Sequence, residues 1–110
     1  ALMIDASSKG KTSLENIQKL MCENPAKIMK IGKRGKLEEG YFADIIAVDL
    51  EKEWIVGSDD IIESRCGWSP YENWKLKGKN ILTIVNGEII FEDGEIKENI
   101  KKGKEVRFYE

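Results

Sequence analysis

The stretch that decides the fold is GKLEEGYFADIIAVD, from Gly35 to Asp49. Its residues 45–48, IIAV, form an unbroken apolar run between two aspartates, a pattern typical of a strand covered on both faces. Ahead of this run, residues 36–39 read as a short, half-buried strand, and Gly40 offers the positive φ that a tight reversal needs. The stretch therefore predicts a β-hairpin whose inner strand requires cover on both sides.

More strands are expected downstream of this pair. Asn86-Gly87 is the strongest short hairpin signal in the chain, and Asp93-Gly94 predicts a further turn. An aromatic loop, CGWSPYENW, spans residues 66–74, and its Pro70 disfavours regular structure. The segments expected to be strands are residues 53–56, 75–79, 81–85 and 88–91. A helical turn is expected at residues 61–63, and the charged tail offers Val106, Phe108 and Tyr109 as a last strand or docking segment.

Helical periodicity dominates the first part of the chain. Residues 1–4 are expected to form the last apolar turns of a helix, and Gly10 is expected to end it. The next helix is expected over residues 12–23, with Thr12 as its N-cap because Glu15 follows at capping-box spacing. Its apolar stripe is Leu14, Ile17, Leu20 and Met21, with Gln18 on the exposed side. Asn24 is then expected to cap a new short helix that begins at Pro25 and ends at Gly32.

Two helices followed by five to seven short strands define an α+β arrangement. These few helical turns cannot cover both faces of the strands that the sequence predicts. Part of the core is therefore expected to come from outside these 110 residues, and the start at Ala1, inside a helix, suggests a cut chain.

Composition limits the chain to one domain or a piece of one, since domains commonly contain about 100–150 residues. Lys and Arg number 18 against 20 Asp and Glu, giving a net charge of −2 with the signs interleaved. This balance argues against binding to nucleic acid or an anionic membrane. The sequence shows no membrane-spanning run and no signal peptide, so a cytoplasmic protein is expected. Cys22 and Cys66 are expected to be buried free thiols.

Motifs for self-sufficient catalysis are absent from the sequence. The chain contains no His, the commonest general base and metal ligand. It has no phosphate loop, dinucleotide fingerprint or nucleophile elbow, and its carboxylates alternate with Lys rather than forming a pair. Residues 32–36, GKRGK, are basic and glycine-rich, but no helix follows them, so a solvated turn is the preferred interpretation. We expect no catalytic, cofactor-binding or metal-ligating residue in this chain.

Several motifs nevertheless resemble one family. NPAKI at residues 24–28, followed by KRGKLEEGYFADIIAVDLEKEW at residues 33–54, resembles the carboxy-terminal part of the amidohydrolase superfamily. WSPYE at residues 68–72 with WKLKGK at residues 74–79 is similar to the cyclic amidohydrolases, and CGWSP at residues 66–70 resembles the dihydroorotase family most. Phe42, Asn73 and Asn80 depart from the residues usual there.

The resemblance implies a (β/α)8 barrel with a zinc site, completed by a small β-sandwich-like domain. Residues 1–32 would be the last helices of that barrel, and residues 33–110 the carboxy-terminal strands of the β-domain. In such enzymes a zinc-bound hydroxide opens a cyclic amide. The family's ligand motifs are not found in this chain, so the resemblance implies a structural segment that binds no zinc. Its partner would be the amino-terminal barrel portion of the same protein. Whether the protein also forms a homo-oligomer is left open by the resemblance.

Two other interpretations remain open at this point. The chain could belong to a dihydropyrimidinase, hydantoinase or allantoinase, since these enzymes share much of the same stretch. It could instead be a non-catalytic β-rich interaction module, in which the aromatic loop of Trp68, Tyr71 and Trp74 contacts a partner protein.

Overall fold

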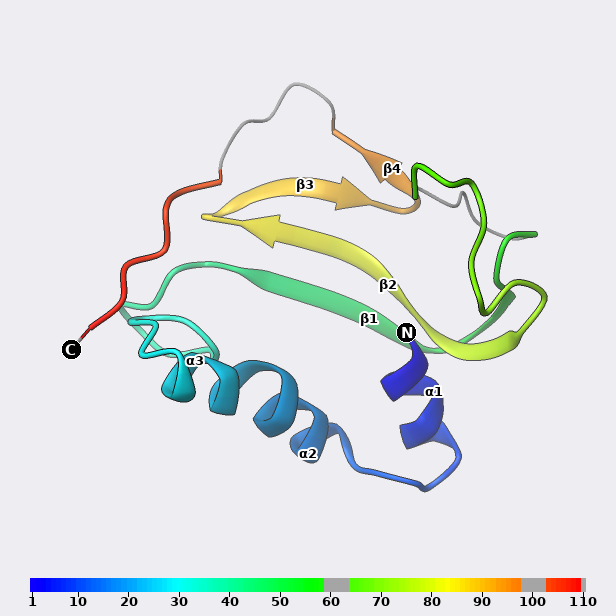
Figure 1. Cartoon of the computed structure of the whole chain (residues 1–110), viewed down its shortest axis with the longest axis horizontal. Helices are drawn as coiled ribbons and strands as arrows, with labels where there is room; N and C mark the ends of the chain where they lie inside the picture. Colours follow the sequence, from blue (N-terminus) through cyan, green and yellow to red (C-terminus); the bar gives the residue numbers. More distant parts are fainter. Residues whose placement is uncertain (59–63, 98–102, 110) are drawn as a thin grey trace.

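A computed structural model describes residues 1–58, 64–97 and 103–109 of the chain. It contains helices followed by a four-stranded antiparallel sheet in the order β1-β2-β3-β4, with the helices on the β1 side (Figure 1). The elements are α1 (Leu2–Ser8), α2 (Leu14–Gln18), the π-helical segment η1 (Lys19–Glu23), α3 (Asn24–Ile28), β1 (Ile45–Ile55), β2 (Lys75–Val85), β3 (Glu88–Glu92) and β4 (Glu95–Ile96). The expected α+β arrangement is confirmed, with four strands in the described residues instead of five to seven.

The hairpin expected around Gly40 is wrong. Residues 36–39 form no strand, and β1 pairs instead with β2, from Ile45 opposite Ile84 to Ile55 opposite Lys75. Gly40 does adopt a positive φ of 82°, but within a loop. The physical reason is length: β2 offers β1 an eleven-residue partner, far more than the four residues before Gly40.

The sequence predicts two pairs of short strands, residues 45–48 with 53–56 and residues 75–79 with 81–85. This prediction is wrong, because each pair forms one long strand, β1 or β2. β1 continues through residues 45–55 across an irregularity between Asp49 and Glu53. There the carboxylate of Asp49 accepts hydrogen bonds from the N–H groups of Glu51 and Lys52, at 3.0 and 3.2 Å. A side chain thus replaces the backbone partner that the bulge removes.

Both turns predicted from Gly-containing dipeptides are confirmed. Asn86 and Gly87 have φ values of 49° and 83° and join β2 to β3. Asp93 and Gly94 have φ values of 47° and 90° and join β3 to β4. Positive φ at both central positions is the signature of the turn that fits the twist of a two-residue hairpin.

The helix boundaries differ from the prediction. Ser13, and not Thr12, is the N-cap, since its Oγ accepts the N–H of Asn16 at 3.1 Å. Asn24 is not an N-cap, because it already has helical angles (φ −64°). It is the first residue of the short helix α3, which ends at Ile28 and not at Gly32. Pro25 lacks the N–H that would bind the carbonyl of Met21, and the wider π turn ahead of it accommodates this loss.

The chain buries little of its apolar surface. Among the described residues, the buried hydrophobic ones are Ala26, Trp54, Val56 and Leu76. The accessible surface is 8497 Å², whereas a compact monomer of this length exposes roughly 6,200 Å². Ile46, in the apolar run, is 61% exposed, so the described residues do not supply the cover expected for this strand. The cysteines are free, as expected, but both are exposed, so their predicted burial is wrong.

The described part of the tail, residues 103–109, returns to the side of the molecule where α3 lies (Figure 1). Phe108 forms an antiparallel bridge with Ile31, and the N–H of Tyr109 donates to the carbonyl of Lys30 at 2.8 Å. The tail is thus a docking segment, one of the two predicted roles. The helical turn predicted at residues 61–63 lies outside the described residues.

Candidate functional site

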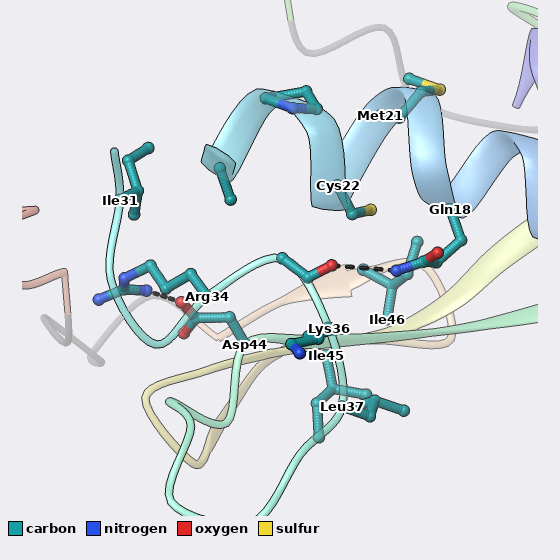
Figure 2. Close-up of a pocket in the computed structure, with 13 residues that line it drawn as sticks. Gln18, Met21, Cys22, Ile31, Arg34, Lys36, Leu37, Asp44, Ile45 and Ile46 are labelled. Atoms are coloured by element: carbon teal, nitrogen blue, oxygen red, sulfur yellow. Dashed lines mark hydrogen bonds and ion pairs between the residues drawn. The ribbon is translucent and has the colours of Figure 1, made fainter. Parts of the chain in front are cut away.

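An apolar groove lies between the helical stretch and the start of β1 (Figure 2). Its volume is about 700 Å³. Met21 and Cys22 line it from η1, Leu37 from the following loop, and Ile46 from β1. Because Met21 and Leu37 are 59% and 79% exposed, the groove presents apolar side chains to whatever lies against it.

One wall of the groove is a loop that packs very closely on the helix. Gln18 Nε2 donates a hydrogen bond to the carbonyl of Gly35 at 3.1 Å (Figure 2). Gly35 has a φ of 89°, and a Cβ atom there would lie 2.7 Å from the Cys22 carbonyl oxygen and 2.8 Å from the Ala26 Cβ. Only glycine satisfies both the backbone angle and the close approach.

The end of the groove is closed by an ion pair between Arg34 and Asp44 (Figure 2). The Arg34 guanidinium also lies 4.3 Å from the centre of the Phe42 ring. Asp44 accepts the N–H of Asn86 at 2.8 Å, and the neighbouring carbonyl of Ala43 accepts the N–H of Gly87 at 3.0 Å. The Ala-Asp pair before β1 therefore ties the loop to the β2–β3 turn.

A second buried polar contact joins α1 to the sheet. Asp5 is 8% exposed, and its Oδ1 accepts the N–H of Lys77 in β2 at 3.0 Å. Its other oxygen pairs with Lys9. The hydrogen bond from Lys9, together with that from the Lys77 N–H, lowers the pKa of Asp5 below its usual range. Beside it, Ile4 packs against the backbone of Gly78.

These arrangements hold the helices, the loop and the sheet together. The carboxylates of Asp5 and Asp44 are both occupied as hydrogen-bond and ion-pair acceptors. In the described part of the chain, no group of three or more Cys, Asp or Glu side chains could hold a metal ion. The described residues do not fit a zinc site. The expectation that the whole chain contributes no site residue stays a prediction.

Sequence reasoning missed the contacts that define this site. Gln18 was expected on the exposed side of its helix, but its amide reaches the loop. No sequence pattern singled out Asp5, because a single acidic residue in an apolar helical turn is normally expected to be exposed to solvent. Asn73, which stands where the family usually has Gly, has a φ of 67° and donates its N–H to the Val56 carbonyl at 3.0 Å. Asn tolerates this left-handed conformation better than most residues.

No helix in the described ranges combines the length and the apolar character needed to cross a membrane.

Comparison with known proteins now identifies the class. Residues 1–90 match the amidohydrolase family, and the chain belongs to that family. Among its relatives, the dihydroorotase of Pyrococcus horikoshii is 46% identical over 96 residues, which cover 87% of this chain and 22% of the relative. The dihydroorotase of Pyrococcus furiosus is 40% identical over 96% of this chain and 27% of its own length. The chain thus resembles dihydroorotases and spans about a quarter or less of their length.

Solved structures agree on the fold. The L-hydantoinase (dihydropyrimidinase) of Arthrobacter aurescens superimposes with a TM-score of 0.75 at 33% identity, over 86% of this chain and 21% of the hydantoinase. An inactive dihydroorotase-like domain of a multifunctional protein from Chaetomium thermophilum gives a TM-score of 0.66 over 93% of this chain and 26% of that domain chain. Its identity of 17% supports the fold alone.

Proposed function

We propose that this chain is the carboxy-terminal structural segment of a dihydroorotase. That zinc-dependent cytoplasmic enzyme interconverts (S)-dihydroorotate and N-carbamoyl-L-aspartate in pyrimidine synthesis. The observation that carries the proposal is the 46% identity to a dihydroorotase over 87% of the chain. The catalytic groups and the zinc ligands belong to the remainder of the protein, and this segment alone is inactive.

In this proposal residues 1–32 are the last helices of the barrel and residues 33–110 are strands of the accessory β-domain. The order of helices followed by a sheet supports the division. β1 and β4 are the edge strands of the sheet, so the amino-terminal part of the protein can add strands beside them. Asp5 and Gly35 then hold the two parts together, through β2 and through the loop before β1.

The test is ring opening by two polypeptides, one carrying the barrel with this segment and one carrying the barrel without it. We expect hydrolysis of dihydroorotate only where both parts are present, and none by the 110 residues alone. The segment is then supplied separately to the truncated barrel, and recovery of activity would support a structural role. Full activity of the truncated barrel would contradict the proposal.

A sister enzyme is the second candidate, because a hydantoinase is the structural neighbour at 33% identity. Hydantoin, dihydrouracil and allantoin are therefore assayed beside dihydroorotate. Turnover of one of these rings in preference to dihydroorotate would identify a hydantoinase, dihydropyrimidinase or allantoinase. Binding of an unrelated protein through the loop of Trp68 and Trp74, without any hydrolysis, would favour the interaction module.

A further inference from the structure

A second cavity lies where the tail docks, on the side of the loop that carries Arg34. Its volume is about 490 Å³. Two segments far apart in the sequence build it, residues 32–34 and the tail residues 104–109, with Phe42 between them. Its lining contains four cations, Lys33, Arg34, Lys104 and Arg107, and one carboxylate, Glu105.

Among the described residues that line this cavity, positive charges outnumber negative ones. Asp44 neutralises Arg34 through their ion pair. Lys33, Lys104 and Arg107 form no ion pair with a carboxylate in the described ranges. With Glu105 counted against these three, two positive charges remain, although the chain as a whole carries −2. Such a local reversal of sign attracts anions to the cavity.

Backbone contacts hold the two segments in place. The bridge between Ile31 and Phe108 and the hydrogen bond from the Tyr109 N–H fix the tail beside the loop. Gly32 lacks a Cβ, and one placed there would collide with the Tyr109 ring. On the opposite side, the N–H of Phe42 donates to the carbonyl of Lys33 at 2.9 Å. The cations therefore project from a defined frame and not from a free tail.

We propose that this cavity binds a small phosphorylated anion. Lys and Arg side chains on both segments supply charge-assisted hydrogen bonds to phosphate oxygens, and the Tyr109 ring forms an apolar wall. The tail cations lie beyond residues 1–90, the part that matches the family. The site thus goes beyond the proposed hydrolase function and does not depend on it. It also revises the interpretation of residues 32–36 as a solvated turn.

The experiment is calorimetric titration of the full polypeptide that carries this segment, with inorganic pyrophosphate as the probe at low salt. Sulfate and chloride at matched ionic strength report on non-specific binding. We expect pyrophosphate to bind with one site per chain. We expect the double variant Lys104→Gln with Arg107→Gln to bind at least tenfold more weakly, because charge-assisted hydrogen bonds are lost.

Matched variants keep the test decisive. Lys52→Gln removes an exposed cation on β1 that does not line the cavity, and its affinity should equal that of the parent protein. Lys33→Gln weakens binding from the loop side without altering the tail. Binding of pyrophosphate no stronger than that of sulfate, or unchanged in the double variant and in Lys33→Gln, would overturn the proposal. Because binding is read without turnover, the result is distinct from that of the hydrolysis assay.

Discussion

At the scale of single residues, the motif around Gly35 and Asp44 has a clear structural meaning. Gly35 allows the loop to approach the helix, and Gln18 secures it from the helical side. Asp44 fixes the other end of the loop by pairing with Arg34 and accepting the N–H of Asn86. Each of these residues performs a task in positioning the loop between helix and sheet.

Gly35→Ala should destabilise the protein by about 2–4 kcal/mol, from the left-handed backbone and the contact with the Cys22 carbonyl. Gly40→Ala is the matched control, since Gly40 has a similar φ of 82° but no atom within 4 Å of its Cβ position. That variant should lose only about 1 kcal/mol. Urea unfolding of the full polypeptide measures both variants, and equal losses would show that the close approach is unimportant.

Asp5 should make stability depend on pH in the acid range. Its pKa in the folded protein lies below the ordinary value of 3.8, because Lys9 and the Lys77 N–H stabilise the carboxylate. The resulting stabilisation is complete above pH 3.8 and is lost as the pH falls through the lower, folded value.

Asp5→Asn should therefore cost about 1–2 kcal/mol near neutral pH, and its difference from the parent protein should shrink below pH 3.8. Glu39→Gln, at an exposed loop position, is the control and should leave the pH profile unchanged. Urea unfolding across the acid range gives the comparison. A constant difference at every pH would mean that the carboxylate charge contributes nothing.

At the scale of elements, β1 and β2 carry the main packing of the sheet. Trp54 on β1 is buried, and its Nε1 donates to the carbonyl of Gly78 in β2 at 3.1 Å. Leu76 and Val56 pack beside it, with Leu2 of α1 against them. This cluster joins α1 to the sheet, next to the hydrogen bond between Asp5 and Lys77.

Trp54→Phe should lower the free energy of unfolding by about 1–3 kcal/mol, because the Gly78 carbonyl loses its indole partner in a buried place. Tyr71→Phe also removes one polar hydrogen from an aromatic residue, but Tyr71 is 39% exposed. That control should change stability by less than about 0.5 kcal/mol. Thermal unfolding measures the two, and a loss confined to Tyr71→Phe would contradict this account.

The elements also show which parts of the fold could be predicted from the sequence. The turns at Asn86-Gly87 and Asp93-Gly94 were predictable, because two adjacent positive φ values depend on adjacent residues. The pairing of β1 with β2 was not, since it joins Ile45 to Ile84 across a long separation. The role of Asp44 was hidden for the same reason, because its partner Asn86 lies 42 residues further along the chain.

At the scale of the whole molecule, the large exposed surface supports the proposal that this chain is a segment of a longer protein. The radius of gyration is 15.4 Å, compared with about 13 Å for a compact domain of this length. Large hydrophobic side chains such as Leu37, Ile28 and Ile46 are more than 60% exposed. The accessible surface exceeds that of a compact monomer of the same mass by roughly 2,300 Å².

The 110 residues alone should therefore self-associate and bind a hydrophobic dye, while the full polypeptide should do neither. Sedimentation of the two proteins at equal concentration measures the association, and dye fluorescence measures the exposed apolar surface. A monomeric, soluble fragment that unfolds cooperatively would contradict the expectation that part of the core comes from outside these 110 residues.

The link between Asp5 and Lys77 spans 72 residues, and this has a consequence for synthesis. The ribosome releases α1 well before the strand that anchors it has been translated. Contacts between distant parts of a chain form late, so α1 remains without this attachment until β2 emerges. A nascent chain whose β2 is still inside the ribosome should therefore be far more sensitive to protease within α1 than one from which β2 has emerged.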